Sequence, residues 1–404
     1  MAGILSLVAG GKGSGSASSV VNLAPLHVHA VETDPERRAR SLKHLLKGNH
    51  VNYSIVYNNN QFNNHNAHIL CTAYILGAND AQLNAIYEEQ IRELEPWTPS
   101  PAEVAPLDWM DFLGRRQYQR AYVDFFEDNL AMEFSYDWKQ VVTHFLFSSE
   151  VPLINGLIGG LGHPLIHLGF AFEMDSKELA MEALGLACVQ HNFLHKFTHD
   201  PAYTTESPFA TTSIDDLIAE LSQDNRLRAG DLFGYDKLDA LFEKHQDVIL
   251  EYWNGWDIQD ATKQFEASQE AAVAMLVATT KPGSKYNFFA AHVLTTNHAV
   301  RALLPHIPSK YHVPLIRQWW LLAIIVFILR GRPAPNQENI SAQVDGRGWS
   351  FAVDKALNSQ YRNDSHYVKV IRVMKECAGT WGDAKDYYLR ATLTFADRFE
   401  GWSF

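Results

Sequence analysis

Apolar residues recur three and four positions apart in segment after segment of this chain, which is the spacing of one face of an α-helix. Strict alternation of apolar and polar residues, the pattern of a half-buried strand, is scarce. The sequence therefore predicts an all-α fold. The predicted helices cover Glu36–Lys47, Asn64–Leu76, Asp80–Leu94, Trp109–Leu113, Tyr118–Glu133, Trp138–Leu157, His163–Phe172, Ser176–His199, Ile214–Ser222, Lys237–His245, Asp247–Trp253, Asp260–Thr280, Asn287–Leu304, Leu315–Arg330 and Ser365–Cys377.

Three predicted helix starts carry polar side chains that can accept hydrogen bonds from the free N–H groups of the first turn. Asp80, Ser176 and Asp364 occupy these positions, and we expect each to cap its helix.

Two connectors stand out by their proline and glycine content, Glu95–Pro106 and Gly331–Gly348. Helices with similar apolar faces continue on both sides of each connector, so neither is predicted to separate two domains.

Residues 1–24 begin with a short apolar stretch that no positive charge precedes, and then become rich in glycine and serine. This composition is typical of a flexible leader rather than a secretory signal. We expect one large all-α catalytic domain over residues 25–404.

The most apolar segment, Trp319–Leu329, lies between Arg317 and Arg330. It is far shorter than the roughly 20 residues that cross a bilayer. The segment is therefore interpreted as a central core helix, and no membrane is expected as a partner.

Composition narrows the possible partners further. The chain has 404 residues, of which 47% are hydrophobic, enough for a large core, and its net charge is −12. Because no strongly basic block occurs, nucleic acid is not expected as a partner.

The three cysteines, Cys71, Cys188 and Cys377, are widely spaced and form no Cys-x-x-Cys, which argues against a disulfide framework or a zinc ribbon. A reducing compartment such as the cytoplasm fits this pattern. The oligomeric state stays open.

The most informative motif is a pair of histidines, His163 and His167, inside the apolar run Gly162–Gly169. Residues four apart share one face of a helix, so both imidazoles can reach one metal ion while neighbouring leucine and isoleucine side chains exclude water. The alternative is a pair of hydrogen-bonded core histidines.

Further histidines among the 18 in the chain accompany this pair. Helical bundles build metal centres from inward side chains of several helices, and imidazole suits zinc, copper, iron and nickel. The additional candidates are His65 with His68, His292 with His298, and His366 with Lys369.

The candidate site lacks an obvious carboxylate ligand. No Glu-x-x-His or His-Glu-x-x-His occurs, so the di-iron carboxylate and zincin patterns both fail. Lys369 offers another source of an anion, because a buried lysine with a depressed pKa can add carbon dioxide and become an N-carboxylate. The alternative is that Lys369 reaches solvent near Arg372 and Glu376.

A stripe formed by His191, His195 and His199 also has helical spacing. Its neighbours are polar, so we interpret it as a solvated or hydrogen-bonded helix face rather than a metal site.

The sequence motifs of several other enzyme classes are absent from this chain. The chain has no Gly-x-Gly-x-x-Gly after a strand, no phosphate-binding loop and no Gly-x-Ser-x-Gly. Its many aromatic residues, such as Trp319–Trp320 and Phe288–Phe289, suit a pocket for a flat apolar ligand, with core packing as the alternative.

Several of these motifs, taken in order, resemble the questin oxidase-like family of fungi. The resemblance spans Leu45 to Arg398, and Asn63 stands where the family often has a histidine. The matching segments are Phe62–Leu70, Leu76–Ala78, Gly162–Gly169, Trp253–Asp257, His292–Pro305, Arg330–Pro333 and Asp364–Arg372.

The resemblance implies an enzyme of fungal polyketide pathways that oxidatively opens a ring of an anthraquinone such as questin. Family members have been described as Baeyer–Villiger-type oxidases, and the resemblance also implies a non-haem iron centre held by histidines and a carboxylated lysine. Carried over to this chain, the resemblance implies that His298 and His366 support the iron ligands from behind or act as acid/base groups. The residues implied near the iron are His65, His68, His163, His167, His292 and Lys369.

Residues and resemblance together predict an Fe(II)-dependent oxygenase that uses O2 to cleave a carbon–carbon bond of a small aromatic polyketide. A flavin-dependent Baeyer–Villiger enzyme would need the dinucleotide-binding fold that this sequence lacks. Two alternatives stay open: an NADPH-dependent Baeyer–Villiger-type monooxygenase acting on the same substrates, and a non-catalytic helical scaffold.

Overall fold

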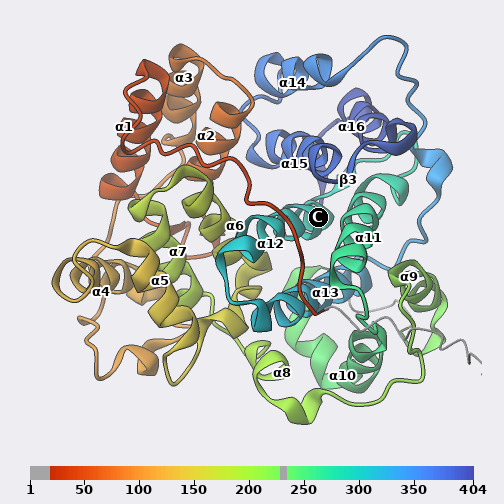
Figure 1. The fold of residues 1–404 in the computed structure, drawn as a ribbon, viewed down its shortest axis with the longest axis horizontal. Helices are drawn as coiled ribbons and strands as arrows, with labels where there is room; N and C mark the ends of the chain where they lie inside the picture. Colours follow the sequence, from red (N-terminus) through yellow and green to blue (C-terminus); the bar gives the residue numbers. More distant parts are fainter. Residues whose placement is uncertain (1–18, 228–233) are drawn as a thin grey trace, which may run out of the picture.

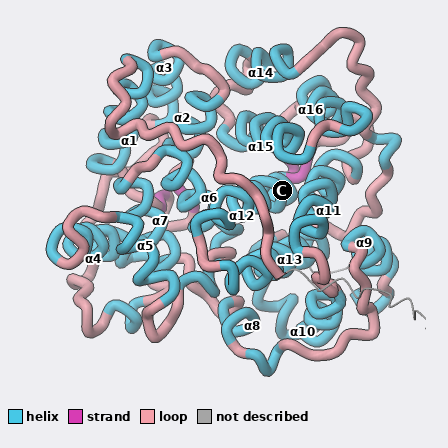
Figure 2. Tube along the Cα trace, viewed as in Figure 1, coloured by secondary structure: helices cyan, strands magenta, loops and turns pink. Residues whose placement is uncertain are grey.

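The computed structural model describes residues 19–227 and 234–404. Within them nearly all regular structure is helical, which confirms the predicted all-α class (Figures 1 and 2). The α-helices are α1 (Arg37–Asn52), α2 (Asn66–Ile75), α3 (Asp80–Gln90), α4 (Gln119–Met132), α5 (Trp138–Phe147), α6 (Gly159–Met174), α7 (Lys177–Val189), α8 (His195–His199), α9 (Ile214–Gln223), α10 (Leu238–Gly255), α11 (Ala261–Val273), α12 (Phe288–Leu303), α13 (His312–Leu329), α14 (Trp349–Asn358), α15 (Ser365–Trp381) and α16 (Tyr387–Arg398).

Across residues 19–227 and 234–404, four two-residue strands form two small ladders. β1 (Val56–Tyr57) pairs antiparallel with β2 (Phe62–Asn63), so that Val56 lies opposite Asn63. β3 (Tyr286–Asn287) pairs in parallel with β4 (Trp402–Ser403). The second ladder therefore ties the C-terminal segment to the start of α12.

Helices α6 and α12 lie at the centre of the molecule (Figure 1). α12 packs against α6, α11, α13 and α15, while α6 also packs against α2 and α7. Their buried apolar residues belong to one continuous hydrophobic cluster. This cluster includes apolar residues from α1 through to α16.

Helix α13 is the core helix that the apolar segment predicts. Segment 309–329 is long and apolar enough to span a membrane by length and composition, but most of it is buried inside the protein. Trp319 donates from Nε1 to the carbonyl of Val293 at 2.9 Å, and Trp320 donates to that of Tyr252 at 3.1 Å. Packing against α12 and α10 thus accounts for the hydropathy of this helix.

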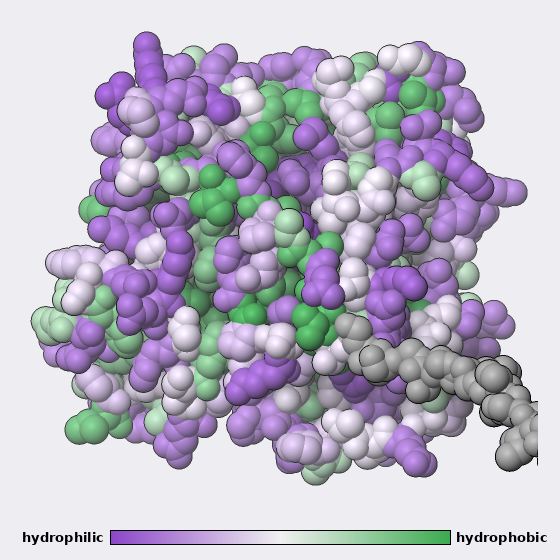
Figure 3. All heavy atoms as spheres, viewed as in Figure 1, coloured by the Kyte–Doolittle hydropathy of each residue, from purple (hydrophilic) through white to green (hydrophobic). Residues whose placement is uncertain are grey.

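On the face shown in Figure 3, hydrophilic residues dominate and hydrophobic ones are interspersed.

The N-terminal leader is only partly described. Residues 1–18 of the predicted leader 1–24 lie outside the described residues. Val21 is buried, and its backbone N–H donates to Nδ1 of His312 at 3.1 Å. The chain therefore already packs against the start of α13 before residue 25.

Two of the three expected caps are confirmed. Ser176 accepts from the N–H of Leu179 at the start of α7, and Asp364 accepts from two N–H groups at the start of α15. The prediction for Asp80 was wrong by one position, because Asn79 caps α3 through a reciprocal hydrogen-bond pair with Gln82.

The long helix predicted over Ser176–His199 was wrong. α7 ends at Val189 and α8 begins at His195, so the His191, His195 and His199 stripe does not lie on one helix. Asn192 explains the break: its side chain accepts from the N–H of Leu194, and its carbonyl meets Nδ1 of His195. Such local side-chain bonds compete with the helical pattern.

Other helix boundaries also differ from the prediction. α5 ends at Phe147 rather than Leu157, and the two helices predicted over 237–253 form one helix, α10, with non-helical dihedrals at His245. α14 and α16 were missed. In α16, aromatic and threonine residues give a weak local helix signal, and packing against α15 compensates for it.

Candidate metal centre

Four histidines meet where four helices converge. His65 lies directly before α2, His163 is in α6, His292 in α12 and His366 in α15. One ring nitrogen from each lies within 4.8 Å of those of the other three. We call these four residues the histidine cluster.

All four imidazoles of the cluster are neutral at physiological pH. Burial, followed by the positive charge of Lys369, lowers the pKa of His163 to about 3. Burial likewise lowers the pKa of His65, His292 and His366 well below the usual value. A neutral imidazole carries one proton, so the other ring nitrogen has a free lone pair.

Backbone carbonyls determine which nitrogen of three cluster histidines carries that proton. Nδ1 of His163 lies 2.5 Å from the carbonyl oxygen of Gly160, and Nδ1 of His65 lies 2.6 Å from that of Asn63. Nδ1 of His292 lies 3.0 Å from the carbonyl oxygen of Phe288. Since only an N–H can donate to a carbonyl, each Nε2 is unprotonated.

The Nε2 atoms of the cluster point at one another in two pairs. Nε2 of His163 and Nε2 of His65 are 2.9 Å apart, and Nε2 of His366 and Nε2 of His292 are 3.1 Å apart. With both protons on Nδ1, no hydrogen links the first pair, and two lone pairs at this distance repel each other. A metal cation bound to both removes this repulsion, so the donor set fits a metal ion of the kind that imidazole prefers.

The start of α6 has a backbone that positions His163. Gly160, Leu161 and Gly162 all have positive φ angles, of 53°, 60° and 77°. This left-handed turn brings the carbonyl of Gly160 back to the ring of His163. A Cβ on Gly162 would lie 2.5 Å from Oγ1 of Thr296 on α12, so glycine is needed at this position on two counts.

His68 and His167 lie behind the cluster and bond to each other. Nε2 of His68 is 3.1 Å from Nδ1 of His167, and Nε2 of His167 is 2.7 Å from Oε2 of Glu182. On the other side, Nδ1 of His68 is 3.4 Å from Nζ of Lys369. The structure thus separates the His163 and His167 pair, with one ring in the cluster and the other in a hydrogen-bonded chain.

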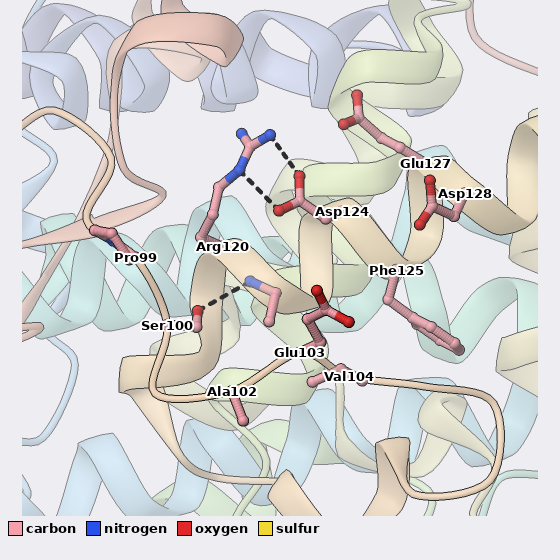
Figure 4. Close-up of a pocket in the computed structure, with 11 residues that line it drawn as sticks. Pro99, Ser100, Ala102, Glu103, Val104, Arg120, Asp124, Phe125, Glu127 and Asp128 are labelled. Atoms are coloured by element: carbon pink, nitrogen blue, oxygen red, sulfur yellow. Dashed lines mark hydrogen bonds and ion pairs between the residues drawn. The ribbon is translucent and has the colours of Figure 1, made fainter.

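The chain continues from Glu182 to the protein surface. Nδ1 of His50 lies 2.9 Å from Oε1 of Glu182, and its Nε2 lies 2.8 Å from Oε1 of Glu127. The side chain of Glu127 is 40% exposed. It lines an open pocket of about 610 Å³ together with Asp124 and Asp128 (Figure 4). No histidine is among the described residues that line this pocket, so it is only the outer end of the chain.

The charges along this chain follow from its hydrogen bonds. Burial alone would raise the pKa of Glu182, but bonds from His167 and His50 lower it to about 2. Burial would lower the pKa of His50, but bonds to Glu127 and Glu182 raise it to about 10. Glu182 is therefore a carboxylate, and His50 is a cation between two anions.

Lys369 is buried at the inner end of the chain. Only 2% of it is exposed, so the alternative in which it reaches solvent was wrong. Burial lowers the pKa of Lys369 to about 7, an effect that Asp364 partly opposes. A substantial fraction of this amine is therefore neutral at physiological pH.

His298 lies apart from the cluster. Its Nε2 is 3.8 Å from Oε1 of Glu173, which forms a buried ion pair with Arg372. Burial would raise the pKa of Glu173, but Arg372 and His298 lower it to about 2. Neither ring nitrogen of His298 has a hydrogen-bond partner among the described residues, and the ring lines a small cavity that Lys369 also borders.

Sequence reasoning did not single out the buried carboxylates. Glu182 and Glu173 follow no metal-binding spacing and reach the histidines only through packing. One signal was available for Glu182, since it is an acidic residue in the apolar segment Leu179–Val189 of α7. A lone glutamate at a core position indicates a buried partner of opposite charge or a hydrogen-bond donor.

An open pocket of about 350 Å³ gives access to the cluster, and we call it the mouth pocket. His65 and His366 form part of its wall. Its volume lies within the usual range for small-molecule sites. The other lining residues are Tyr57, Glu89, Gln90, Glu93, Leu94, Phe288, Asn363, Asp364, Ser365 and Trp402.

Known proteins resemble this chain over most of its length. A Baeyer–Villiger oxidase of Pestalotiopsis microspora is 25% identical over 399 residues, covering 89% of this chain and 86% of the relative. A Baeyer–Villiger monooxygenase of Aspergillus aculeatus is 28% identical over 372 residues, covering 82% and 77%. Questin oxidase of Aspergillus terreus is 24% identical over 218 residues, covering 51% and 48%.

The family model described as questin oxidase-like matches residues 62–374, a span that contains the whole histidine cluster and Lys369. Its named relatives are oxidases and monooxygenases, so this chain is an oxidoreductase. The extent of the match shows that the chain belongs to the questin oxidase-like family.

Proposed function

We propose that this protein is a non-haem iron-dependent oxygenase that cleaves a ring carbon–carbon bond of a questin-like anthraquinone in fungal polyketide biosynthesis. The observation that carries the proposal is the pair of unprotonated Nε2 atoms of His65 and His163, 2.9 Å apart. The relatives named as questin oxidase and Baeyer–Villiger oxidases support the substrate class and the oxidative chemistry.

The cluster histidines are the proposed ligands of the iron. Ferrous iron supplies the one-electron chemistry by which dioxygen reacts with a closed-shell aromatic molecule. The backbone carbonyls of Asn63, Gly160 and Phe288 keep three ligand rings in the required tautomer, and the mouth pocket brings the substrate to His65 and His366.

Lys369 is proposed to supply the anion that the histidines lack. The neutral amine adds carbon dioxide to form an N-carboxylate and releases one proton, and the remaining N–H can still donate to Nδ1 of His68. Burial and the lowered pKa of about 7 support this role.

The test combines metal analysis with oxygen-18 labelling. We expect about one iron per chain and no tightly bound flavin, and loss of iron in His163→Ala but not in the exposed His144→Ala. With ¹⁸O2 and a questin-like anthraquinone, a dioxygenase places both labelled atoms in the ring-opened product. Active protein with zinc only or without metal would contradict the proposal.

The second candidate is an NADPH-dependent Baeyer–Villiger-type monooxygenase, which the names of the relatives favour. In that reaction one oxygen atom enters the product, and two electrons from NADPH reduce the other to water. One labelled atom per product together with an NADPH requirement would therefore select this candidate. The non-catalytic scaffold has no such support, since the chain is an oxidoreductase by family.

A further inference from the structure

The mouth pocket has a lining that suits a particular kind of ligand. Three aromatic rings, those of Tyr57, Phe288 and Trp402, line it beside the two cluster histidines. Three carboxylates also line it, and none of its described lining residues is a lysine or an arginine. Apolar faces combined with an anionic wall favour flat aromatic ligands and disfavour anions.

The aromatic side of the pocket lies directly against the cluster. The ring centroid of Phe288 is 4.4 Å from that of His366 and 4.9 Å from that of His292. The Trp402 ring is 6.1 Å from both Phe288 and His366. A flat ligand stacked on these rings would therefore lie next to the histidines.

Two of the three carboxylates already have partners. Asp364 accepts from the backbone N–H of His366 and of Tyr367 and, at 2.8 Å, from Nε1 of Trp402. Glu89 forms an ion pair of 2.7 Å with Arg92. The hydrogen bonds fix the orientation of the Asp364 carboxylate. The ion pair compensates the charge of Glu89.

Glu93 is the carboxylate available to a ligand. It is exposed and has no ion pair within the described part of the chain. Glu93 and Tyr57 both line the pocket, and after burial the charge of Glu93 is the largest contribution that raises the pKa of the Tyr57 phenol. Glu93 is therefore a lining carboxylate that is free to accept a hydrogen bond from a ligand.

Ser365 provides a second, independent sign of a ligand. The residue is only 7% exposed, it lines the pocket, and its Oγ has no hydrogen-bond partner among the described residues. A buried hydroxyl without a partner is unfavourable, so a polar group of a ligand or water is expected there.

We propose that the mouth pocket binds flat aromatic molecules with uncharged hydroxyl groups and rejects those with a carboxylate, and that Glu93 determines this specificity. The inference rests on the proposed function for the reaction that follows, but binding can be measured without it. A phenolic hydroxyl can donate to Glu93, whereas a carboxylate brought near Glu93 meets a like charge.

Binding of two probes to the purified full-length protein tests the inference. The probes are 1,8-dihydroxyanthraquinone and its 3-carboxylate, compared by equilibrium dialysis under anaerobic conditions. At low salt we expect the neutral probe to bind about tenfold more tightly, and at about 0.5 M salt only two- to threefold, because salt screens the repulsion. Glu93→Lys should reduce the low-salt ratio to about one or invert it.

Glu88→Lys is the matched control. Glu88 is exposed on α3 and does not line the pocket. Its replacement by lysine changes the net charge by the same amount as Glu93→Lys. Equal affinity of the two probes for the wild type, or an equal effect of both lysine variants, would overturn the inference. If the ratio and its dependence on Glu93 hold but neither probe is oxidised with iron and dioxygen, the proposed function fails and the specificity stands. If the probes are oxidised but Glu93 has no effect, only this inference fails.

Discussion

Single hydrogen bonds determine what each histidine around the site can do. Glu182 is a carboxylate, so Nε2 of His167 must donate to it, and Nδ1 of His167 must accept from Nε2 of His68. Nδ1 of His68 is then an acceptor that faces Lys369. One buried carboxylate thus orients a chain of side chains that ends at the proposed N-carboxylate.

Lys369 should be essential for activity. Lys369→Ala is expected to abolish turnover because it removes the proposed anionic ligand, and a short-chain carboxylate should restore part of it. Carbon-13 NMR of protein equilibrated with labelled bicarbonate should show a carbamate signal that Lys369→Ala lacks. Lys375→Ala on the same helix is the control and should keep both activity and signal. Full turnover in Lys369→Ala would contradict this role and leave histidines as the only proposed ligands of the iron.

His50 should make stability depend on pH. Its pKa rises from 6.5 to about 10 on folding, so its stabilising effect is fully present below about pH 6.5 and is lost as the pH rises through 10. Glu182, with a pKa lowered to about 2, stabilises above about pH 4.5 and loses its effect below that.

Urea unfolding at pH 6, 8 and 9.5 measures the effect of His50. The free energy of unfolding of the wild type should fall across this range more steeply than that of His50→Gln, which lacks the titrating group. His144→Gln, at an exposed position, should follow the wild type. Identical pH dependence in wild type and His50→Gln would show that the buried ion pairs do not stabilise the fold in this way.

The left-handed turn at the start of α6 links the backbone conformation of this helix to the position of His163 in the cluster. Gly162→Ala places a Cβ where φ is +77° and where Thr296 is 2.5 Å away. We expect a loss of unfolding free energy of about 2–4 kcal/mol and a loss of bound iron, because His163 is the next residue. Calorimetry and metal analysis of the purified variant measure both effects.

Gly169→Ala is the matched control on the same helix. A Cβ there meets its nearest neighbours at 3.5 Å, which is ordinary contact, so stability should be unchanged or slightly higher. If both alanine variants behave alike, the positive φ and the close approach to Thr296 do not matter for the site.

Most helices could be predicted because their signal is local. The spacing of apolar residues and the caps at Ser176 and Asp364 are contained in short stretches of sequence. The break at Asn192 and helix α16 could not be predicted in this way. At Asn192, local side-chain hydrogen bonds interrupt a segment whose apolar spacing is helical. In α16, packing against α15 stabilises a segment of weak helix propensity.

Which histidines belong to the cluster depends on how the helices pack against one another. Helical spacing correctly places His163 and His167 on one helix, but it does not reveal that only His163 faces His65, His292 and His366. His366, which the family resemblance implied as an acid/base group, lies within the cluster in the structure. Each of the four rings comes from a different part of the chain, so their meeting is a property of the tertiary fold and not of any single motif.

The same arrangement predicts that iron stabilises the entire domain. An ion held by residues at α2, α6, α12 and α15 binds the folded chain and not the unfolded one, so at one hundred times its dissociation constant it adds about 2.7 kcal/mol. We expect anaerobic protein loaded with ferrous iron to have a Tm a few degrees above that of chelator-treated protein. His292→Ala should lose this difference, and His144→Ala should keep it. If iron binds at one per chain but the loaded and chelated wild-type proteins melt together, the ion does not bridge these helices.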